Sequence, residues 1–381
     1  MSKAHIAIIG AGVGGLTAAL ALRHAGFSVA LFEAAHALGE VGAGLTLSRG
    51  SQAVMRQLGL QDRLSSFAAP SVKLPFVHYR TGALLAGTIN AAPDSSDAFV
   101  PRQCHRADLH ALLVGALDIP VHLGHRLVGL ETTERGVRIG FANGQSATAD
   151  AVIGADGVHS VARKLLWGDT PAQFSHQIAY RFLVKQAAAA QFLDHGRGAV
   201  FIGPGATFNR YLLRGGSLLN CVGIVASDTW LSDGWQTPAS RAEMSHAFNN
   251  WHEQVTGLIA IAEQPIKWGL FHHAPLPRWR KGCVTLLGDA AHAMPPFLGM
   301  GAAMAIEDGM ILARALALEP TIEAGLERYE TARRPRTADI LSKSVEQGKL
   351  TQASNPDVYD HANAPAADRT ILDYDPVIAP I

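Results

Sequence analysis

Residues 4–33 read AHIAIIGAGVGGLTAALALRHAGFSVALFE, and this stretch decides the fold. An apolar run rich in β-branched residues ends at Gly10, and helix-forming residues follow as far as Gly26, where a helix can stop. A second apolar run, residues 27–32, ends at Glu33. Strand, helix and strand in this order predict a βαβ unit with parallel strands.

The turn of this unit carries Gly10, Gly12 and Gly15 as G-x-G-x-x-G, with Gly14 as a further glycine. The first glycine permits a tight turn, the second lets a pyrophosphate approach the backbone, and the third lets the helix pack closely on the strand. The helix start offers free N–H groups and the positive end of the helix dipole. Glu33 stands where an acid accepts a hydrogen bond from a ribose hydroxyl. The pattern predicts a bound adenine dinucleotide and does not distinguish NAD from FAD; the alternative is a glycine-rich turn with a surface glutamate.

The composition excludes several classes of protein. The chain has 381 residues, which suggests two domains, and its 32 basic and 32 acidic residues give zero net charge. Since no basic block is present, we expect neither nucleic acid nor an anionic membrane as the main partner. The hydrophobic fraction of 48% is sufficient for a substantial core.

The cysteines and the hydropathy favour a protein of the cytoplasm. Cys104, Cys221 and Cys283 are far apart, which predicts no disulfide framework and no CxxC metal site. No histidine pattern suggests a metal either. We find no secretory signal and no clean apolar stretch of 18 residues.

Further elements follow from periodicity and turn residues. We predict helices over 51–58, 106–117 and about 302–318, a hairpin over 74–86, a strand over 136–141 that turns at Asn143–Gly144, and a loop over 90–97. Buried strands are predicted over 151–154 and 282–287, and strand-like pieces of a second sheet over 180–184, 210–213, 218–225 and 266–271. The last thirty residues contain Asn355-Pro, Ala364-Pro and Asp375-Pro and look loosely ordered.

Two more motifs follow predicted buried strands. The segment 154–163 reads GADGVHSVAR, and the segment 288–301 reads GDAAHAMPPFLGMG. Each places an aspartate, Asp156 or Asp289, at the carboxyl end of an apolar strand, where ligands bind in open α/β sheets. The alternative for either residue is an aspartate that caps the following helix.

Taken together, these motifs resemble the single-component FAD-dependent aromatic hydroxylases, the group that includes salicylate, 4-hydroxybenzoate and 6-hydroxynicotinate hydroxylases. The salicylate-type branch is most similar, and the resemblance runs from Ile6 to about Arg336. It implies an α/β fold in which a Rossmann-like FAD-binding domain is interleaved with an α+β substrate domain built on a mixed sheet. The expected division is 1–72, 100–172 and 276–350 for FAD, 73–99 and 173–275 for substrate, and 351–381 for a C-terminal tail.

The resemblance also implies cofactor contacts. Those expected at the ADP half of FAD come from Gly10, Gly12, Gly14, Gly15 and Glu33. Arg106, which opens an R-x-D-L pattern, would contact the pyrophosphate or the ribityl chain, and Asp289 would bond a ribityl hydroxyl. Asp156 would lie between FAD and the path by which NAD(P)H docks. Backbone N–H groups of Gly299, Gly301 and Ala302 would face the pyrimidine edge of the flavin, and the carbonyl of Pro296 would lie near its reactive carbon.

The chain departs from the family pattern at two places. Ser48-Arg49-Gly50 replaces a segment that often contains proline and asparagine, so Arg49 lies either near the flavin or on the surface. Met300 replaces a usual glutamine, which removes an amide side chain from the neighbourhood of flavin or substrate.

As the resemblance implies it, NADH or NADPH reduces FAD, O2 forms a flavin C4a-hydroperoxide, and an electron-rich ring is hydroxylated. The substrate would be a small aromatic or N-heteroaromatic acid or phenol, with decarboxylation where the attacked carbon carries a carboxylate. Alternatives are a flavin-dependent epoxidase or reductase of the same fold, a non-catalytic flavin-binding redox sensor, and a plain NAD dehydrogenase. The protein would be a monomer or a homodimer.

Substrate-binding candidates come from the second domain. Tyr211 is a candidate base or a core tyrosine, and His272 and His273 are further candidate bases for which a surface or core position is the alternative. Arg181 and Arg214 would pair with a substrate carboxylate or lie in solvent. We expect His292 to be structural, and we expect the charged run 327–336 to be a solvated helix end.

Overall fold

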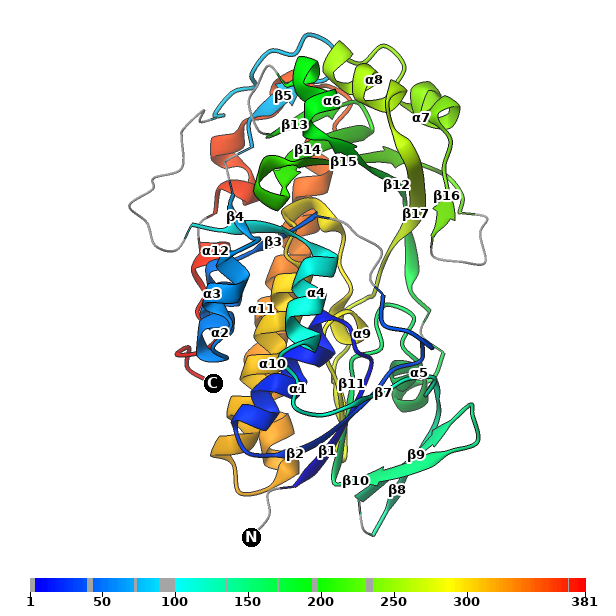
Figure 1. The fold of residues 1–381 in the computed structure, drawn as a ribbon, viewed down its shortest axis with the longest axis vertical. Helices are drawn as coiled ribbons and strands as arrows, with labels where there is room; N and C mark the ends of the chain where they lie inside the picture. Colours follow the sequence, from blue (N-terminus) through cyan, green and yellow to red (C-terminus); the bar gives the residue numbers. More distant parts are fainter. Residues whose placement is uncertain are drawn as a thin grey trace.

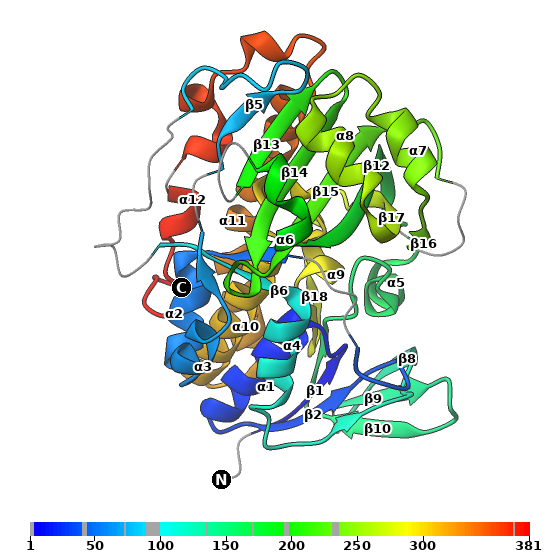
Figure 2. The same ribbon diagram turned by 45° about the horizontal axis from the view of Figure 1, so that its top comes forward.

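The computed structural model describes residues 4–39, 44–71, 74–88, 100–134, 136–169, 171–193, 198–230, 236–368 and 370–381. The loop predicted over 90–97 lies outside these residues. Figures 1 and 2 show one part built on a six-stranded sheet and another built on a seven-stranded sheet. The long helix α11 (Ile322–Thr351) reaches from the first part to the second.

The predicted βαβ unit lies at the centre of the six-stranded sheet. β1 (His5–Ile9) runs parallel to β2 (Ser28–Phe32) and to β11 (Ala151–Gly154), and α1 (Val13–His24) connects β1 with β2. The strand order is β18-β19-β11-β1-β2-β7, and the remaining strands are β7 (Val121–His122), β18 (Arg280–Lys281) and β19 (Val284–Leu286). Four of the five residues of β1 are buried, as its continuous apolar run requires.

Helices and a second small sheet complete this core. α1 packs against α4 (Arg106–Val114) and α10 (Gly301–Leu318). The meander of β8 (Leu127–Thr133), β9 (Gly136–Phe141) and β10 (Ser146–Ala149) adds buried residues to the same hydrophobic core. α5 (Val161–Trp167) and α9 (Asp289–His292) follow β11 and β19.

The second sheet is mixed, as the resemblance implied. Its order is β16-β17-β12-β15-β14-β13-β5, and the printed pairs are antiparallel except for β13 with β5. Its strands are β5 (Phe76–His78), β12 (Gln173–Lys185), β13 (Gly198–Gly203), β14 (Ala206–Leu213), β15 (Leu218–Ala226), β16 (Thr237–Pro238) and β17 (Glu263–His272). One face packs against α7 (Arg241–Ala247), α8 (Glu253–Ala260) and the pair α6 (Gln186–Ala189) and η1 (Ala190–Phe192).

A three-stranded sheet joins the two parts. It consists of β3 (Gly44–Leu47), β6 (Arg102–His105) and β4 (Ala69–Pro70), with α2 (Arg49–Gln57) and α3 (Gln61–Ser65) beside it. The backbone N–H of Gly44 donates to Oδ1 of Asn220 on β15 at 3.2 Å. β3 therefore touches the face of the large sheet that α7 and α8 leave uncovered.

Residues 352–368 and 370–381 are ordered, so the prediction of a loose tail was wrong. They form η4 (Pro356–Val358), η5 (His361–Asn363), η6 (Pro365–Ala367) and α12 (Thr370–Asp373). Tyr359 and Ile371 are buried, and the Tyr359 hydroxyl accepts a hydrogen bond from Gln347 of α11. Pro356 and Pro365 each begin a short helical turn, which is compatible with tight packing.

The charged run 327–336 is also not a solvated helix end. It lies inside α11, where Tyr329, Glu330 and Arg333 are buried. The Tyr329 hydroxyl donates to the Leu286 carbonyl at 3.1 Å, and Glu330 accepts from the backbone N–H groups of Trp279 and Arg280. The run is polar because it binds the strand and loop that precede the segment 288–301.

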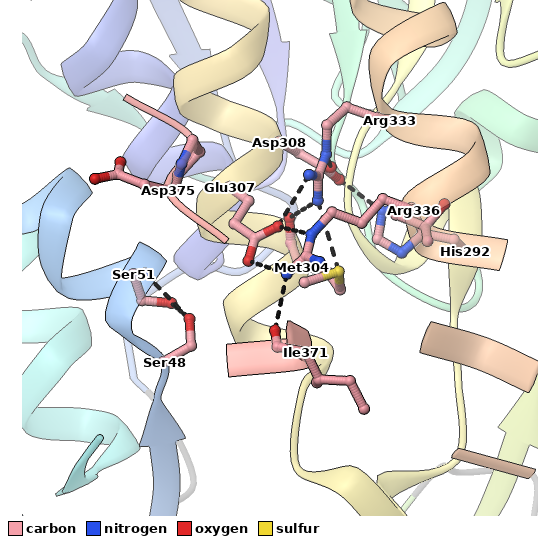
Figure 3. A network of polar contacts seen from close by, with 12 residues as sticks. Ser48, Ser51, His292, Met304, Glu307, Asp308, Arg333, Arg336, Ile371 and Asp375 are labelled. Atoms are coloured by element: carbon pink, nitrogen blue, oxygen red, sulfur yellow. Dashed lines mark hydrogen bonds and ion pairs between the residues drawn. The ribbon is translucent and has the colours of Figure 1, made fainter. Parts of the chain in front are cut away.

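The ion cluster in Figure 3 joins α10 to α11. Glu307 and Asp308 of α10 are fully buried. Nε of Arg333 donates to Asp308 at 2.6 Å, Nη1 of the same guanidinium lies 2.9 Å from Glu307, and Nε of Arg336 donates to Glu307 at 2.7 Å. Nε2 of His292 lies 2.6 Å from the second oxygen of Asp308. Burial alone would raise the pKa of Asp308, but the charges of His292 and Arg333 hold this pKa at about 2.

The predicted helices and strands are otherwise confirmed, with ends shifted by a few residues. The domain boundaries stay a prediction. In the described part of the chain no helix is both long and apolar enough to cross a membrane.

Replacing Arg333 with methionine should lower the free energy of unfolding by about 3–5 kcal/mol, because two buried carboxylates would lose a partner. Equilibrium denaturation measures this loss. As a control, Arg23→Met breaks an exposed pair with Asp118 and should change stability little. Equal effects of the two variants would show that the cluster does not hold α10 to α11.

Candidate active site

The glycine-rich turn contains two kinds of glycine. Gly10 has φ +108°, and a Cβ there would lie 2.3 Å from the Ala155 carbonyl oxygen, whereas a Cβ at Gly15 would lie 2.0 Å from the Gly10 carbonyl oxygen. The protein's own packing therefore requires both. Gly12 has an ordinary φ of −72°, and no atom lies within 4 Å of the position of its Cβ. Nothing in the described chain requires Gly12 to be glycine, which fits a ligand that must approach its backbone closely.

Gly14 has a packing role, because its Cβ would come within 3.0 Å of side chains on both β19's loop and α10, at Leu287 and Ala305. α1 begins directly after Gly12 with no side-chain cap, so its first N–H groups are available to an anion. Open space beside Gly12 and an uncapped helix start together form a cradle that fits a pyrophosphate.

Glu33 closes this cradle at the end of β2. Its two carboxylate oxygens accept from the backbone N–H groups of Ala11 and Ala35, each at 2.8 Å. Nε2 of His110 on α4 donates to the Ala11 carbonyl at 2.8 Å, since a carbonyl can only accept. Glu33 therefore shapes the turn, and the spare lone pairs of its carboxylate can still accept from a ribose hydroxyl.

Asp156 bonds the start of α5, although the N-cap residue of this helix is Ser160. It accepts from the Ser160 hydroxyl and, at 3.0 Å, from the Ala162 N–H at the start of α5. Burial raises the pKa of Asp156, and these hydrogen bonds oppose that rise. Arg163 in the same motif is buried and donates to the carbonyls of Ala290 and Ala291. The segment 154–163 is thus bonded directly to the segment 288–301.

Asp289 is different, because it is exposed between two buried neighbours, Gly288 and Ala290. Its carboxylate has no hydrogen bond to the described residues. A carboxylate at the end of β19 that makes no hydrogen bond to the described residues fits the expected bond to a ribityl hydroxyl.

The loop before α10 presents backbone rather than side chains. Gly299 has φ +66°, a left-handed conformation that favours glycine, and Gly301 has open space at its Cβ position. The Pro296 carbonyl accepts from the Gly299 N–H at 3.0 Å, and the Ser344 hydroxyl donates to the Pro295 carbonyl at 2.6 Å. Among the described residues no side chain caps the N-terminus of α10, so the N–H groups at Gly301 and Ala302 can meet a flavin edge.

Met300 has an apolar environment. It is buried in an apolar cluster with Ile340 of α11 and Ile371 of α12. The methionine therefore binds the C-terminal segment to the start of α10, a packing role that an amide would perform poorly.

The large sheet turns Arg181 and Tyr211 toward these loops. A Cβ at Gly44 would lie 2.4 Å from the Tyr211 hydroxyl oxygen, so the phenol packs directly on β3. Burial raises the pKa of Tyr211 to about 12, although Arg181 opposes the rise. Burial lowers the pKa of Arg181 to about 10. Its guanidinium lies 4.4 Å from the ring centroid of Trp268 and forms no ion pair with a described carboxylate.

Three further arginines were singled out in the sequence. Arg106 is exposed at the start of α4, and its charge lowers the pKa of Arg181, which places the two near each other. Arg49 lies 3.9 Å from Asp373 of the C-terminal segment. Arg214 is 45% exposed and makes a two-point ion pair with Asp108, at 2.7 and 3.0 Å. Because a carboxylate of this chain already matches Arg214, it is a poor candidate for a substrate carboxylate.

The two candidate histidines also have internal partners. Nε2 of buried His273 donates to the Val158 carbonyl at 2.7 Å, and burial lowers the His273 pKa. His273 lines a hollow of about 350 Å³ beside Trp279 and α11. Arg181 and Tyr211 do not line this hollow. His272 bonds Ser175 at 2.9 Å. His105, which sequence reasoning missed, is buried beside Gly44, and burial, with help from Arg214 and Arg181, lowers its pKa.

Known proteins match this arrangement along nearly the whole chain. A family model described as an FAD binding domain covers residues 3–344. The 3-amino-4-hydroxybenzoate 2-monooxygenase PtmB3 of Streptomyces platensis is 34% identical over 353 residues, which are 91% of this chain and 88% of that protein. The 6-hydroxynicotinate 3-monooxygenase of Bordetella bronchiseptica is 32% identical over 361 residues, 93% of this chain and 94% of that protein.

The chain belongs to the FAD-binding monooxygenases. A solved substrate complex of salicylate hydroxylase agrees, with a TM-score of 0.83 and 28% identity over 98% of this chain and 96% of that one. Within the family this is an FAD-dependent aromatic monooxygenase, and the family uses NAD(P)H as co-substrate. The alternatives of a redox sensor and a plain NAD dehydrogenase are therefore excluded.

Gly12→Ala should reduce the flavin content of the purified protein, with FAD affinity lowered about tenfold or more, because the methyl group enters the space kept for the pyrophosphate. The melting temperature of the flavin-free protein should stay unchanged. Gly15→Ala is the matched variant, and overpacking against Gly10 should cost it about 1–3 kcal/mol of stability. Flavin absorbance and thermal unfolding separate the two effects; normal flavin retention in Gly12→Ala would contradict the assignment.

Asp289→Ala should weaken FAD binding about tenfold through loss of one charge-assisted hydrogen bond. Because Asp289 is exposed and makes no hydrogen bond to the described residues, the apoprotein should unfold at the same temperature as the parent. Titration of apoprotein with FAD measures the affinity, and exposed Asp62→Ala is the control. Unchanged affinity in Asp289→Ala removes Asp289 from the flavin site.

Proposed function

We propose that this monooxygenase hydroxylates a small aromatic or N-heteroaromatic acid, with O2 and NADH or NADPH as co-substrates. The observation that carries the proposal is Arg181. Its side chain is partly buried, its Nε is shielded from solvent, its guanidinium lies over the Trp268 ring, and it has no acidic partner in the described chain. A buried cation without a counter-ion is costly, and a substrate carboxylate would supply the missing charge.

The proposed cofactor site uses the residues that fit it. Gly12 and the start of α1 would hold the pyrophosphate, Glu33 a ribose and Asp289 the ribityl chain, while Gly301 and Ala302 would face the flavin ring. When bound, FAD supplies the redox chemistry, which comprises acceptance of hydride from NAD(P)H and activation of O2. The uncapped α10 start would stabilise negative charge on the ring.

The remaining residues would orient the substrate and exclude water. Arg181 would bind the carboxylate, and Phe297, in one apolar cluster with Ile224 and Leu270, would cover one end of the sheet face. We infer that Tyr211 acts as a neutral hydrogen-bonding phenol and not as the base, because a pKa near 12 keeps it protonated at neutral pH. The relatives named above, which act on an amino-hydroxybenzoate and on a hydroxynicotinate, support an aromatic acid as substrate.

Substrate-stimulated NAD(P)H oxidation with a panel of hydroxybenzoates, aminobenzoates and hydroxypyridine carboxylates tests the proposal, with hydroxylated product quantified. Arg181→Met should raise KM for the carboxylate-bearing substrates about 100-fold, because it removes a charge-assisted contact. Phenols that lack the carboxylate should respond alike in both proteins. Exposed Arg138→Met is the matched control. An unchanged KM for carboxylates in Arg181→Met, at normal flavin content, refutes the assignment.

A further inference from the structure

The three central strands of the large sheet form an ordered grid on the face opposite α7 and α8. Residues directly opposite one another on antiparallel strands share a face. One row across β12, β15 and β14 therefore holds Arg181, Val222 and Asn209. The flanking rows are Leu183, Asn220, Tyr211 and Ala179, Ile224, Thr207.

Four buried side-chain atoms on this grid have no hydrogen-bond partner among the described residues. They are Nε of Arg181, Oγ1 of Thr207, Oδ1 of Asn209 and Nδ2 of Asn220. On the opposite face of the same strands, buried Arg210 donates through Nη2 to Gln254 of α8 at 2.6 Å. The four atoms without a partner gather instead on the face that turns toward β3.

Asn220 and Asn209 differ in the hydrogen-bonding group that each leaves without a partner: a donor on Asn220 and an acceptor on Asn209. Oδ1 of Asn220 accepts from the Gly44 N–H, which fixes the orientation of its amide and leaves Nδ2 as a donor without an acceptor. Asn209 leaves an acceptor without a donor. Asparagine is disfavoured in strands, so two of them at inward positions of central strands need a reason beyond packing.

The row of Arg181, Val222 and Asn209 is about as long as a small aromatic acid. Neighbouring strands are about 4.8 Å apart, so Arg181 and Asn209 lie roughly 10 Å apart across Val222. The Arg181 guanidinium leans over Trp268, on the side away from β15. A ring over Val222 would then direct its carboxylate to Arg181 and its opposite edge to Asn209 and Asn220.

We propose that Asn209 and Asn220 determine substrate specificity by recognising the ring substituents that lie across the ring from the carboxylate. Nδ2 of Asn220 donates to an oxygen substituent, and Oδ1 of Asn209 accepts from a hydroxyl or amino group. This rests on the proposed function, and it narrows the substrate to an aromatic acid with a donor in the para or meta position. An isomer with its only hydroxyl ortho to the carboxylate leaves both amides unmatched.

The test compares matched isomers on the FAD-loaded enzyme. Dissociation constants of benzoate and of 2-, 3- and 4-hydroxybenzoate and 4-aminobenzoate are measured through the change in flavin absorbance, together with coupled NAD(P)H oxidation. The parent enzyme should bind its preferred para or meta isomer at least tenfold more tightly than benzoate or 2-hydroxybenzoate. Asn209→Leu should remove this preference, with a 10- to 100-fold loss for the preferred isomer and little change for benzoate.

Asn220→Asp is the sharper variant, because it keeps the size and the oxygen that accepts from Gly44 while it replaces the donor by an acceptor. It should weaken binding of hydroxy isomers at least tenfold at unchanged flavin content. Asn209→Asp keeps the acceptor and should keep the isomer preference, which tests position 209 if the leucine variant does not fold. Asn249→Leu, at an exposed position on the other side of the sheet, is the control.

The outcomes separate the two proposals. If the parent enzyme responds to aromatic acids but both Asn209→Leu and Asn220→Asp keep its isomer preference, the specificity assignment is overturned and the proposed function stands. A preference of the parent enzyme for the ortho isomer also overturns the specificity assignment, while the proposed function stands. If no aromatic acid binds or stimulates NAD(P)H oxidation, the proposed function fails and the specificity assignment fails with it.

Discussion

Two carboxylates buried side by side on α10 determine how the flavin-binding loops are arranged. Glu307 and Asp308 are adjacent and fully buried, so each requires a cation within bonding distance. Arg333 and Arg336 supply these charges from one face of α11, which fixes the two helices against each other. The second oxygen of Asp308 accepts from the Gly288 N–H at 3.0 Å and also bonds His292. The same charge therefore fixes the end of β19, from which the Asp289 side chain projects.

The C-terminal segment belongs to this arrangement. Arg336 also donates to the Ile371 carbonyl at 3.0 Å, and its guanidinium lies 4.0 Å from the ring centroid of Tyr374. Met300 packs on Ile371 from the start of α10. A helix N-terminus that must face a charged ring needs a fixed position, because its electrostatic effect fades within one turn. Ions on one side and an apolar cluster on the other hold the start of α10 in place.

Much of this could be predicted from the sequence, since β1, its glycines and Glu33 form a local pattern in which each residue type has one physical role. The ion cluster could not, because α11's arginines show the same spacing as those of a solvated helix, and only the packing against α10 makes them buried. The sheet face that carries Asn209 and Arg181 also has a local signal in the sequence. Along β14, Thr207, Asn209 and Tyr211 alternate with Phe208, Arg210 and Leu212. Alternation identifies a face, but the strand pairing that brings Arg181 into one row with Asn209 comes from residues far apart in sequence.

The sheet face that carries Arg181 differs from a packed core. Arg210 on β14 and Arg181 on β12 lie on opposite faces of this sheet. The Arg210 side chain donates to Gln254 of α8, which covers it, whereas the Arg181 side chain has no hydrogen bond to the described residues. A buried polar atom without a partner costs about 1–3 kcal/mol, so four of them on one face represent a substantial loss of stability. Such a loss is tolerated where a bound molecule recovers it, and the recovered free energy then depends on how well the donors and acceptors of that molecule match those of the protein. The same atoms that weaken the empty fold thereby give the substrate site its selectivity.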